Sequence, residues 1–358
     1  MDIVIVGAGI GGLALANGLL ADGHQVRVLE RAPSLRTDGA AVTIFSNGAA
    51  AAAGLEAPLT GLGAPIETLE FWTSGGQPFA RADLRVLRRK TGFGVATIPR
   101  AAILRRFVEG LPTGTVRYNC SVNDALPTAD VVVGADGYRS AVRRATLGDG
   151  DAVENGWVTW QGLTKTLPAL AGGADARCVV GPAGLCGLMP AGDGLVQWWF
   201  AVPPPGPGGR PIVAWLRERF GGYADPVPEL LDGLAEADVQ AYPHVLHRVP
   251  DRWGTGRTTL LGDAAHAFPP SQAQGANQAL EDAWHLRRAL RQPGDIAASL
   301  RRYERERARR IRRIARLAAS EVTNQPPSAA ARLAGRLLSP AMLARLHLAT
   351  IRRSSSVL

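Results

Sequence analysis

Residues 2–12 of the chain are Asp2-Ile3-Val4-Ile5-Val6-Gly7-Ala8-Gly9-Ile10-Gly11-Gly12. The first five form a short apolar run rich in β-branched side chains, which is typical of a strand buried on both faces of a sheet. Leucines and alanines then recur with the period of a helix as far as Asp22-Gly23, and residues 25–29 form a second strand-like run. This order predicts a strand, a glycine turn, a helix and a parallel strand, which together make a βαβ unit.

The glycines of this stretch have separate physical tasks. Gly7 permits the tight turn that leaves the strand, Gly9 lets a pyrophosphate approach the backbone, and Gly12 lets the helix pack closely on the strand. The N-terminus of the helix that follows, with Ile10 and Gly11 in the glycine stretch, offers free N–H groups and the positive end of the helix dipole to phosphates. The stretch therefore predicts a binding site for a dinucleotide cofactor.

Glu30 directly follows the second strand. A carboxylate at this position accepts hydrogen bonds from ribose hydroxyls of the cofactor. The motif alone does not separate NAD from FAD, although its place at the start of the sequence favours FAD. The choice depends on two motifs further along the chain.

Each of those motifs is a strand that ends in a glycine and an aspartate. Residues 129–135 predict a buried strand that runs into Asp136-Gly137, and residues 258–261 predict another that runs into Gly262-Asp263. The carboxyl ends of parallel strands are the usual place of ligand contact in α/β sheets, although Asp136-Gly137 alone also fits an ordinary turn. Asp263 is placed to hold a polyol hydroxyl, and the helix expected near Gly275 offers free amides to a negatively charged ring.

Together the three motifs resemble those of the FAD-dependent aromatic hydroxylases, the group A flavoprotein monooxygenases similar to p-hydroxybenzoate hydroxylase. The glycine stretch matches the family's GxGxxG motif, Asp136 to Ser140 match its DGxxS motif, and Gly262-Asp263 match its GD motif. Order and spacing agree over residues 1 to about 320. The segment from Gly262 to Ala283 is the most specific part of the resemblance.

The resemblance implies which residues hold the cofactor. Glu30 would bind the adenosine ribose, with Arg31 beside it, and the backbone at Val122, on a short strand, would contact the adenine. Asp136 would organise the pyrophosphate region, in a motif associated with both FAD and NAD(P)H. Nearer the flavin ring, the implied contacts are Arg100 beside the ring and ribityl chain, Asp263 on the ribityl hydroxyls, and the backbone amides of Gln274, Gly275, Ala276 and Asn277 at the pyrimidine edge.

One position departs from the family pattern. Family members usually have Gly-Gln-Gly where this chain has Ala273-Gln274-Gly275. The methyl group of Ala273 either fits harmlessly or crowds the space in which a flavin peroxide forms. FAD binding is expected to be unaffected, whereas the oxygen chemistry is left open.

Residues 155–250 differ in character from the rest of the chain. They contain tryptophan-rich strand patterns over residues 156–162, 177–180 and 195–202, and a helix is expected over residues 212–220. The resemblance places this sheet over the flavin as the roof of the substrate pocket. Candidate pocket walls are Trp160, Met189, Trp198, Phe200 and Phe268, whose alternative role is plain core packing.

No catalytic triad or metal-ligand spacing is visible in the sequence, and no metal is expected. His244 and His247 are positioned to steer a phenolic proton, although a structural role is the alternative for both. Pro270 lies in the loop expected beside the flavin. His247 and Pro270 are therefore the candidate catalytic residues, and the cofactor is expected to supply the main chemistry.

The expected fold is α/β, with a Rossmann-like FAD-binding βαβ domain of the p-hydroxybenzoate hydroxylase type, an inserted mostly antiparallel β-sheet substrate domain and C-terminal helices. The FAD-binding domain would comprise residues 1–154, with a small contribution to the substrate domain around residues 65–98, and would be completed by residues 251–325. The substrate domain would comprise residues 155–250. Residues 326–358 would form a helical tail.

The net charge of +9 comes almost entirely from arginine, because Lys90 and Lys165 are the only lysines. A nucleic-acid-binding protein is one interpretation of this charge. The densest cluster, residues 301–316, also contains glutamates and fits a solvated helix face. We therefore expect no nucleic-acid partner and interpret the arginines as a compositional bias.

Other features predict a cytoplasmic protein. No window is apolar enough for a membrane span, and the N-terminus lacks the basic region of a signal peptide. The three cysteines have no disulfide or metal spacing and are expected to be free thiols. A monomer and a homodimer are both compatible with the sequence.

The resemblance implies a monooxygenase that uses FAD, NADH or NADPH, and O2 to hydroxylate an aromatic or polyketide-like small molecule through a flavin C4a-hydroperoxide. A second hypothesis keeps FAD but replaces hydroxylation by epoxidation, Baeyer–Villiger oxidation, dehydrogenation or a redox-neutral cyclisation. The sequence does not identify the substrate.

Overall fold

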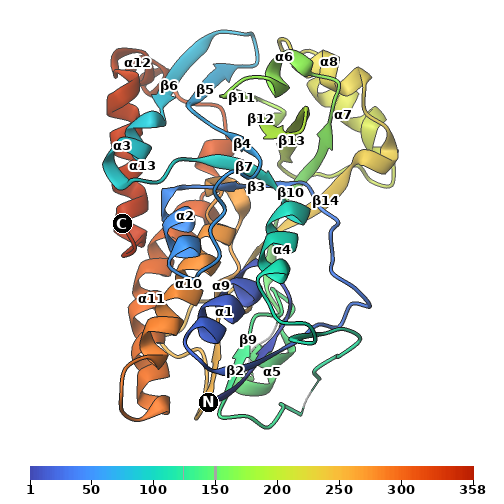
Figure 1. The fold of residues 1–358 in the computed structure, drawn as a ribbon. Coiled ribbons are helices and arrows are strands. Elements are labelled where there is room, and N and C mark those ends of the chain that lie inside the picture. Colours follow the sequence, from blue (N-terminus) through green and yellow to red (C-terminus); the bar gives the residue numbers. More distant parts are fainter. Residues whose placement is uncertain (124, 149–150) are drawn as a thin grey trace.

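The computed structural model describes residues 1–123, 125–148 and 151–358. Its first sheet has the N-terminal strand at its centre. This five-stranded sheet has the order β15-β9-β1-β2-β8, and its strand pairs are parallel (Figure 1). Its strands are β1 (Asp2–Val6), β2 (Gln25–Leu29), β8 (Val116–Arg117), β9 (Val131–Gly134) and β15 (Thr258–Leu260).

Parallel pairing brings the three glycine-containing motifs together. β1 lies between β2 and β9, and β15 pairs with β9, so the carboxyl ends of β1, β9 and β15 meet at one edge of the sheet. The β-branched residues of β1 and β9 are almost fully buried, as expected for strands covered on both faces. Gly7, Asp136 and Asp263 thus lie at the same edge, although they are far apart in the sequence.

A second sheet lies above the first in Figure 1 and has the order β14-β10-β13-β12-β11-β5-β6. Its pairs are antiparallel except for the parallel pair of β11 with β5. Its strands are β5 (Thr68–Thr73), β6 (Pro78–Asp83), β10 (Val153–Thr164), β11 (Asp175–Gly181), β12 (Gly184–Gly192), β13 (Leu195–Val202) and β14 (Gln240–Leu246). A small sheet of β3 (Ala41–Ile44), β7 (Ala96–Pro99) and β4 (Ala64–Pro65) connects the two layers.

Helices cover both sheets. Some helices follow strands of the parallel sheet or lie between the two layers. They are α1 (Ile10–Ala21), α2 (Ser46–Ala53), α3 (Arg85–Thr91), α4 (Arg100–Glu109) and α5 (Ala141–Leu147). Those of the second layer are α6 (Pro168–Ala171), α7 (Ile212–Phe220) and α8 (Val227–Asp232). Short 3₁₀ turns are η1 (Glu236–Asp238), η2 (Pro270–Gln272) and η3 (Val322–Asn324).

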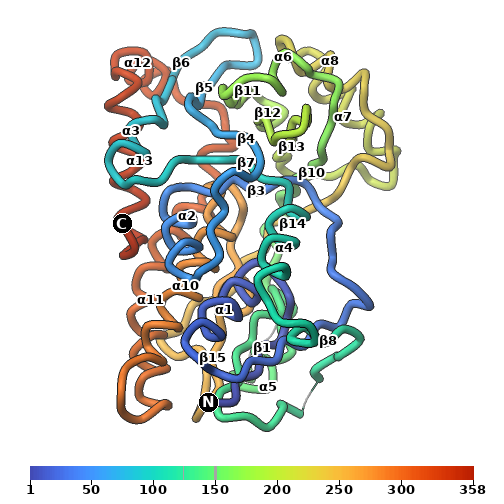
Figure 2. Tube along the Cα trace, viewed as in Figure 1, coloured from blue at the N-terminus to red at the C-terminus, as the bar shows by residue number. Residues whose placement is uncertain are grey.

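The C-terminal helices span the height of the molecule. They are α9 (Asp263–His266), α10 (Gly275–Leu290), α11 (Ile296–Ala319), α12 (Ala329–Leu337) and α13 (Pro340–Ser354). α10 packs against α1 and α2, and α11 packs against α10. The chain then returns through α12 and α13, which pack on β6, so these helices lie beside the second sheet (Figure 2).

The expected α/β class, with a second, mostly antiparallel sheet and C-terminal helices, is confirmed. β5 and β6 come from the part of the chain that was expected to contribute to the second sheet, and α7 has the expected bounds. β12 was not expected. No helix in the described ranges is long and apolar enough to cross a membrane.

Candidate functional site

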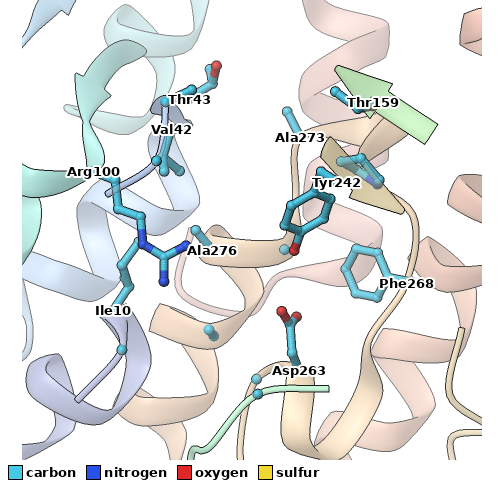
Figure 3. A pocket seen from close by; sticks show the side chains of 18 of the residues that line it. Ile10, Val42, Thr43, Arg100, Thr159, Tyr242, Asp263, Phe268, Ala273 and Ala276 are labelled. Carbon is cyan, nitrogen blue, oxygen red and sulfur yellow. The ribbon is translucent and has the colours of Figure 1, made fainter. Parts of the chain in front are cut away.

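A single cavity of about 990 Å³ reaches from the glycine loop of the first sheet to the inner face of the second sheet. Its walls come from all three motifs, the small sheet, strands of the second sheet and α13. Figure 3 shows part of it, with Ile10 and Arg100 on one side, Thr159 and Phe268 on the other, and Asp263 below. The described residues contain no cluster of ligands that could hold a metal ion.

The glycine loop forms one end of this cavity. Gly7 has φ +107°, and a Cβ there would lie 2.4 Å from the backbone oxygen of Ala135. A Cβ on Gly12 would lie 2.2 Å from the Gly7 oxygen, so Gly12 packs against the turn and does not line the cavity. Gly9 is different, because a Cβ there meets only the Ala135 oxygen, at 4.0 Å. The space beside Gly9 is therefore open to a ligand.

Glu30 holds the glycine loop from the end of β2. Its carboxylate is buried and accepts hydrogen bonds from the Ala8 and Ala32 backbone N–H groups, both at 2.9 Å. Glu30, Arg31 and Val122 all line the cavity, although Val122 lies outside any strand. The carboxylate thus shapes the loop in addition to facing the expected ribose position.

We expect Glu30→Gln to weaken FAD binding roughly 10- to 100-fold, because the amide cannot accept both backbone N–H groups and charge-assisted hydrogen bonds contribute about 1.5–3 kcal/mol. Titration of apoprotein with FAD, followed by flavin fluorescence, measures the affinity. Gln25→Ala, an exposed change on the same strand, is the control. An unchanged affinity in Glu30→Gln would contradict the assigned role.

Asp136 organises the second motif through its own helix. Its carboxylate accepts hydrogen bonds from the Ser140 hydroxyl at 2.6 Å and from the Ala141 N–H at 2.8 Å. Arg143, on the same helix, is almost fully buried and donates to the backbone oxygens of Ala264 and Ala265. Arg143 therefore connects the second motif to the third, a role that the sequence analysis did not predict.

Asp263 and Arg100 project toward the centre of the cavity (Figure 3). Burial raises the pKa of Asp263, while His266 and Arg100 oppose the shift. Tyr242, which was not expected in the site, points its hydroxyl toward Asp263 (Figure 3). The negative charge of Asp263 and burial raise the pKa of Tyr242 well above its usual range, so its hydroxyl stays protonated.

The loop before α10 forms the floor beside this group. Gly275 and Ala276 line the cavity, whereas Gln274 and Asn277 do not. The Asn277 side chain donates to the Ala273 and Thr43 oxygens and accepts from the Phe45 N–H, and thereby fixes the loop. Ala273 itself has φ 48° and ψ 33°, a left-handed conformation that favours glycine. Its methyl group faces the cavity (Figure 3).

A buried charge network supports this floor from behind. Arg307 contacts Asp282 at 2.6 Å and Glu281 at 3.1 Å, and all three side chains are fully buried. Asp282 also accepts from the Gly262 N–H at 2.8 Å and contacts His266 at 2.5 Å. Burial acts to raise the pKa of Asp282, but His266 and Arg307 outweigh it and lower the pKa to about 2. The expectation of a wholly solvated arginine face over residues 301–316 is therefore wrong at Arg307.

The substrate half of the cavity is lined by one face of the second sheet, and this face is opposite to the one that the sequence analysis expected. Trp160, Trp198 and Phe200 do not line it; they pack with α7 and α8 in a separate core. Side chains alternate between the faces of a strand, so their sequence neighbours face the cavity instead. The expectation for these three rings is corrected. The residues of the second sheet that line the cavity are Leu69, Phe71, Ala80, Arg81, Ala82, Thr159, Gln161, Cys178, Leu185, Met189, Gln197, Trp199, Ala201, Gln240, Ala241 and Tyr242.

The candidate catalytic residues separate in the structure. Pro270, like Phe268, lines the cavity. His247 does not: its Nε2 lies 2.9 Å from the backbone oxygen of Tyr138, beside the second motif. The structure therefore corrects the expectation for His247. All three cysteines are free, and burial raises the pKa of Cys178 to about 12.

α13 supplies a wall that the sequence analysis did not assign. Leu343, Leu346, His347 and Thr350 line the cavity, and their spacing corresponds to one helix face. The ring of His347 lies 5.0 Å from that of Phe45. Buried polar atoms without a partner among the described residues include three on the cavity wall: Arg100 Nε, Gln197 Oε1 and His347 Nε2.

Burial lowers the pKa of His347 to about 4. Between pH 6.5 and 4 the unfolded state therefore binds a proton that the folded state does not, and stability falls as the pH is lowered. From pH 7 to pH 5 this group should reduce the free energy of unfolding by about 1–2 kcal/mol. His347→Leu should lose that part of the pH dependence in denaturant titrations. An identical dependence in both proteins would contradict the assignment.

Comparison with known proteins agrees with this geometry. Residues 113–318 match the family model described as FAD binding domain, and residues 5–55 match the NAD(P)-binding Rossmann-like domain. The 3-amino-4-hydroxybenzoate 2-monooxygenase PtmB3 of Streptomyces platensis is 35% identical, with 88% of this chain and 86% of that protein covered. The aurachin C monooxygenase/isomerase of Stigmatella aurantiaca is 30% identical, with 87% and 86% covered.

Solved structures resemble the whole chain. Klebsiella pneumoniae HpxO complexed with FAD and uric acid superimposes with a TM-score of 0.90 at 27% identity, covering 99% of this chain and 97% of that one. An FAD-dependent urate hydroxylase of Klebsiella pneumoniae is 30% identical over 87% of both chains. This likeness confirms the fold type that the three motifs implied.

Proposed function

Because this chain belongs to the group A flavoprotein monooxygenases, we propose that it hydroxylates a small aromatic compound that carries a hydroxyl or amino group. It is an FAD-dependent monooxygenase that uses NAD(P)H and O2. The observation that carries the proposed substrate class is the continuous cavity that joins the three cofactor motifs to a face of the second sheet. Relatives named for urate and for 3-amino-4-hydroxybenzoate support an aromatic substrate.

The residues at the cofactor end fit FAD. The open backbone at Gly9 leaves room for a pyrophosphate, and the start of α10 at Gly275 offers free backbone N–H groups. Glu30 and Asp263 would accept hydroxyl groups of the cofactor, and the unpartnered Arg100 Nε belongs to the lining of the same cavity. When bound there, FAD supplies electron transfer from NAD(P)H and the activation of oxygen.

The other end fits an aromatic ring with a hydrogen-bond donor. Met189, Trp199 and Phe268 give it an apolar lining. The Nε2 of Gln197 donates to the Ala41 oxygen at 2.9 Å, which fixes the amide orientation and leaves the buried Oε1 as an acceptor without a partner. A hydroxyl or amino group on the substrate would satisfy it.

The test is a screen of the purified holoprotein with hydroxy- and aminobenzoates, using 3-amino-4-hydroxybenzoate as the first probe. We expect the ligand to stimulate NADH or NADPH oxidation and to gain one oxygen atom from isotopically labelled O2. Gln197→Leu should raise KM about 10-fold, since a buried hydrogen bond contributes roughly 1–1.5 kcal/mol. A colourless protein that takes up no FAD would contradict the proposal.

The second hypothesis rests on Ala273, whose left-handed backbone and methyl group lie where the family usually has glycine. Such crowding would favour dehydrogenation or redox-neutral cyclisation over oxygen insertion. Products that form without incorporation of labelled oxygen would support this alternative. Ala273→Gly would then be expected to increase the incorporation.

A further inference from the structure

The hydroxyl of Thr159 lies at one end of a row of three hydrogen-bonded side chains. Thr159 Oγ1 is 2.7 Å from His244 Nε2, and His244 Nδ1 is 2.7 Å from Glu321 Oε1. Thr159 is 4% exposed, His244 0% and Glu321 2%. The three residues come from β10, β14 and the αL residue after α11, so the fold brings them together over long sequence separations.

The direction of the hydrogen bonds follows from the partners of Glu321. Its carboxylate accepts from the Asn155 amide at 2.9 Å and from the Asn324 amide at 2.7 Å, as an ionised carboxylate does. It therefore accepts from His244 Nδ1–H, which leaves Nε2 with a lone pair. Nε2 then accepts the Thr159 hydroxyl proton. The Thr159 oxygen is left free to accept a hydrogen bond from a ligand.

Thr159 faces the cavity. It lines the wall together with Ala201 and Tyr242, which are its register partners on β13 and β14. Figure 3 shows it on the opposite side of the cavity from Arg100, and Tyr242 is its neighbour across the strands. The carboxylates on the described cavity wall all lie on the cofactor side, at Glu30, Asp38, Asp136 and Asp263. Among the described residues of the second sheet on this wall, Thr159 is the one whose hydroxyl contacts a histidine that in turn contacts a carboxylate.

Backbone geometry indicates that Glu321 is held in place for this contact. It adopts φ 51°, a left-handed conformation that is unfavourable for a glutamate. The next residues form η3, whose Thr323 and Asn324 also line the cavity. Trp157 stacks on the His244 ring with centroids 6.4 Å apart. The imidazole is thus held by Glu321 at Nδ1 and packed by Trp157, as a proton acceptor must be to remain aligned.

We propose that Thr159, His244 and Glu321 form a base relay that removes the proton from a ring hydroxyl of the substrate. The proposal rests on the proposed function and identifies its substrate as a phenol. The substrate O–H bond breaks as its proton moves to Thr159 Oγ1, while the original Thr159 proton moves to His244 Nε2. The substrate oxygen keeps the electron pair, and Glu321 stabilises the imidazolium. This step involves no oxidation or reduction. The proton returns from the relay to the product oxygen when the hydroxylated product leaves.

This transfer would prepare the ring for reaction. A phenolate donates more electron density to its ring than a phenol does, and the ring then reacts faster with an electrophilic oxygen. Thr159 is the residue that touches the substrate, while His244 and Glu321 act through it. General-base assistance of this kind contributes about 100-fold or more to the rate.

The experiment compares Thr159→Val with Thr159→Ser in the FAD-loaded protein. The probe is 4-nitrophenol, whose ionised form is visible by absorbance. On the wild type we expect the apparent pKa of the bound phenol to lie at least about one unit below its value on Thr159→Val, and Thr159→Ser should restore the wild-type value. With 3-amino-4-hydroxybenzoate, kcat should fall roughly 100-fold in Thr159→Val and shift its pH profile upward.

Thr164→Val, on the same strand but away from the cavity wall, is the matched control and should behave like the wild type. His244→Gln should reproduce the Thr159→Val result. Equal ionisation and equal kcat in Thr159→Val and wild type would overturn the relay while leaving the proposed function intact. Failure of the wild type to bind or ionise any phenol would overturn the relay, and an absence of any hydroxylated product would overturn the proposed function as well.

Discussion

Arg307→Ala should lower the free energy of unfolding by about 3–5 kcal/mol, because it removes the arginine that pairs with the two buried carboxylates Asp282 and Glu281. Arg307→Lys should recover only part of this loss, since one ammonium group cannot replace contacts to Asp282, Glu281 and Gln278 together. Denaturant titration of each variant measures the loss.

Arg307→Ala should also weaken FAD binding. Asp282 holds the Gly262 N–H and His266, and Gly262 directly precedes the cavity residue Asp263. Arg309→Ala removes an exposed arginine from the same helix and is the control; it should stay within about 0.5 kcal/mol of the wild type. A loss below 1 kcal/mol in Arg307→Ala would show that the network contributes little.

Gly12→Ala should yield an unstable protein that does not retain FAD, whereas Gly9→Ala should fold normally and still fail to bind it. A methyl group at Gly12 would lie 2.2 Å from the Gly7 backbone oxygen, so α1 must move away from β1. Overpacking of this kind costs about 1–3 kcal/mol or more. At Gly9 the backbone is extended, with φ −80° and ψ −179°, and a methyl group meets nothing in the protein closer than 4.0 Å.

The pair separates two effects of the glycine loop. Thermal unfolding of the apoproteins should distinguish Gly12→Ala from the wild type but not Gly9→Ala. FAD titration should show at least a 100-fold weaker affinity for both variants, equivalent to about 2.7 kcal/mol. If Gly9→Ala binds FAD as tightly as the wild type, the cofactor does not approach the backbone at that residue.

The convergence of the three motifs at one edge of the sheet could be predicted from the sequence because each motif is local. A glycine or aspartate that directly follows a buried strand has its position set by that strand, and parallel pairing then brings the three strand ends together. Gly7, Asp136 and Asp263 were identified in this way. Their partners Arg143 and Arg307 were not, because a buried arginine on a helix has no sequence signature distinct from a solvated one.

The sequence could predict that a β-sheet forms the substrate end of the cavity, but not which face of that sheet lines it. Residues 198–200 are Trp-Trp-Phe, and apolar side chains on both faces remove the alternation that identifies the buried face. The packing of α7 and α8 decides that Trp199 faces the cavity and Trp198 does not. β12 was missed because its glycines and proline (Gly184–Gly192) are typical of a loop.

The helix α13 and the glycine loop come from opposite ends of the described chain, yet they line the same cavity. Leu343, Leu346, His347 and Thr350 face the ligand space without contributing to any of the three cofactor motifs. Substitutions on this helix face can therefore alter which molecules are accepted while the nucleotide-holding framework is kept. Directed evolution of this protein could begin at these four positions.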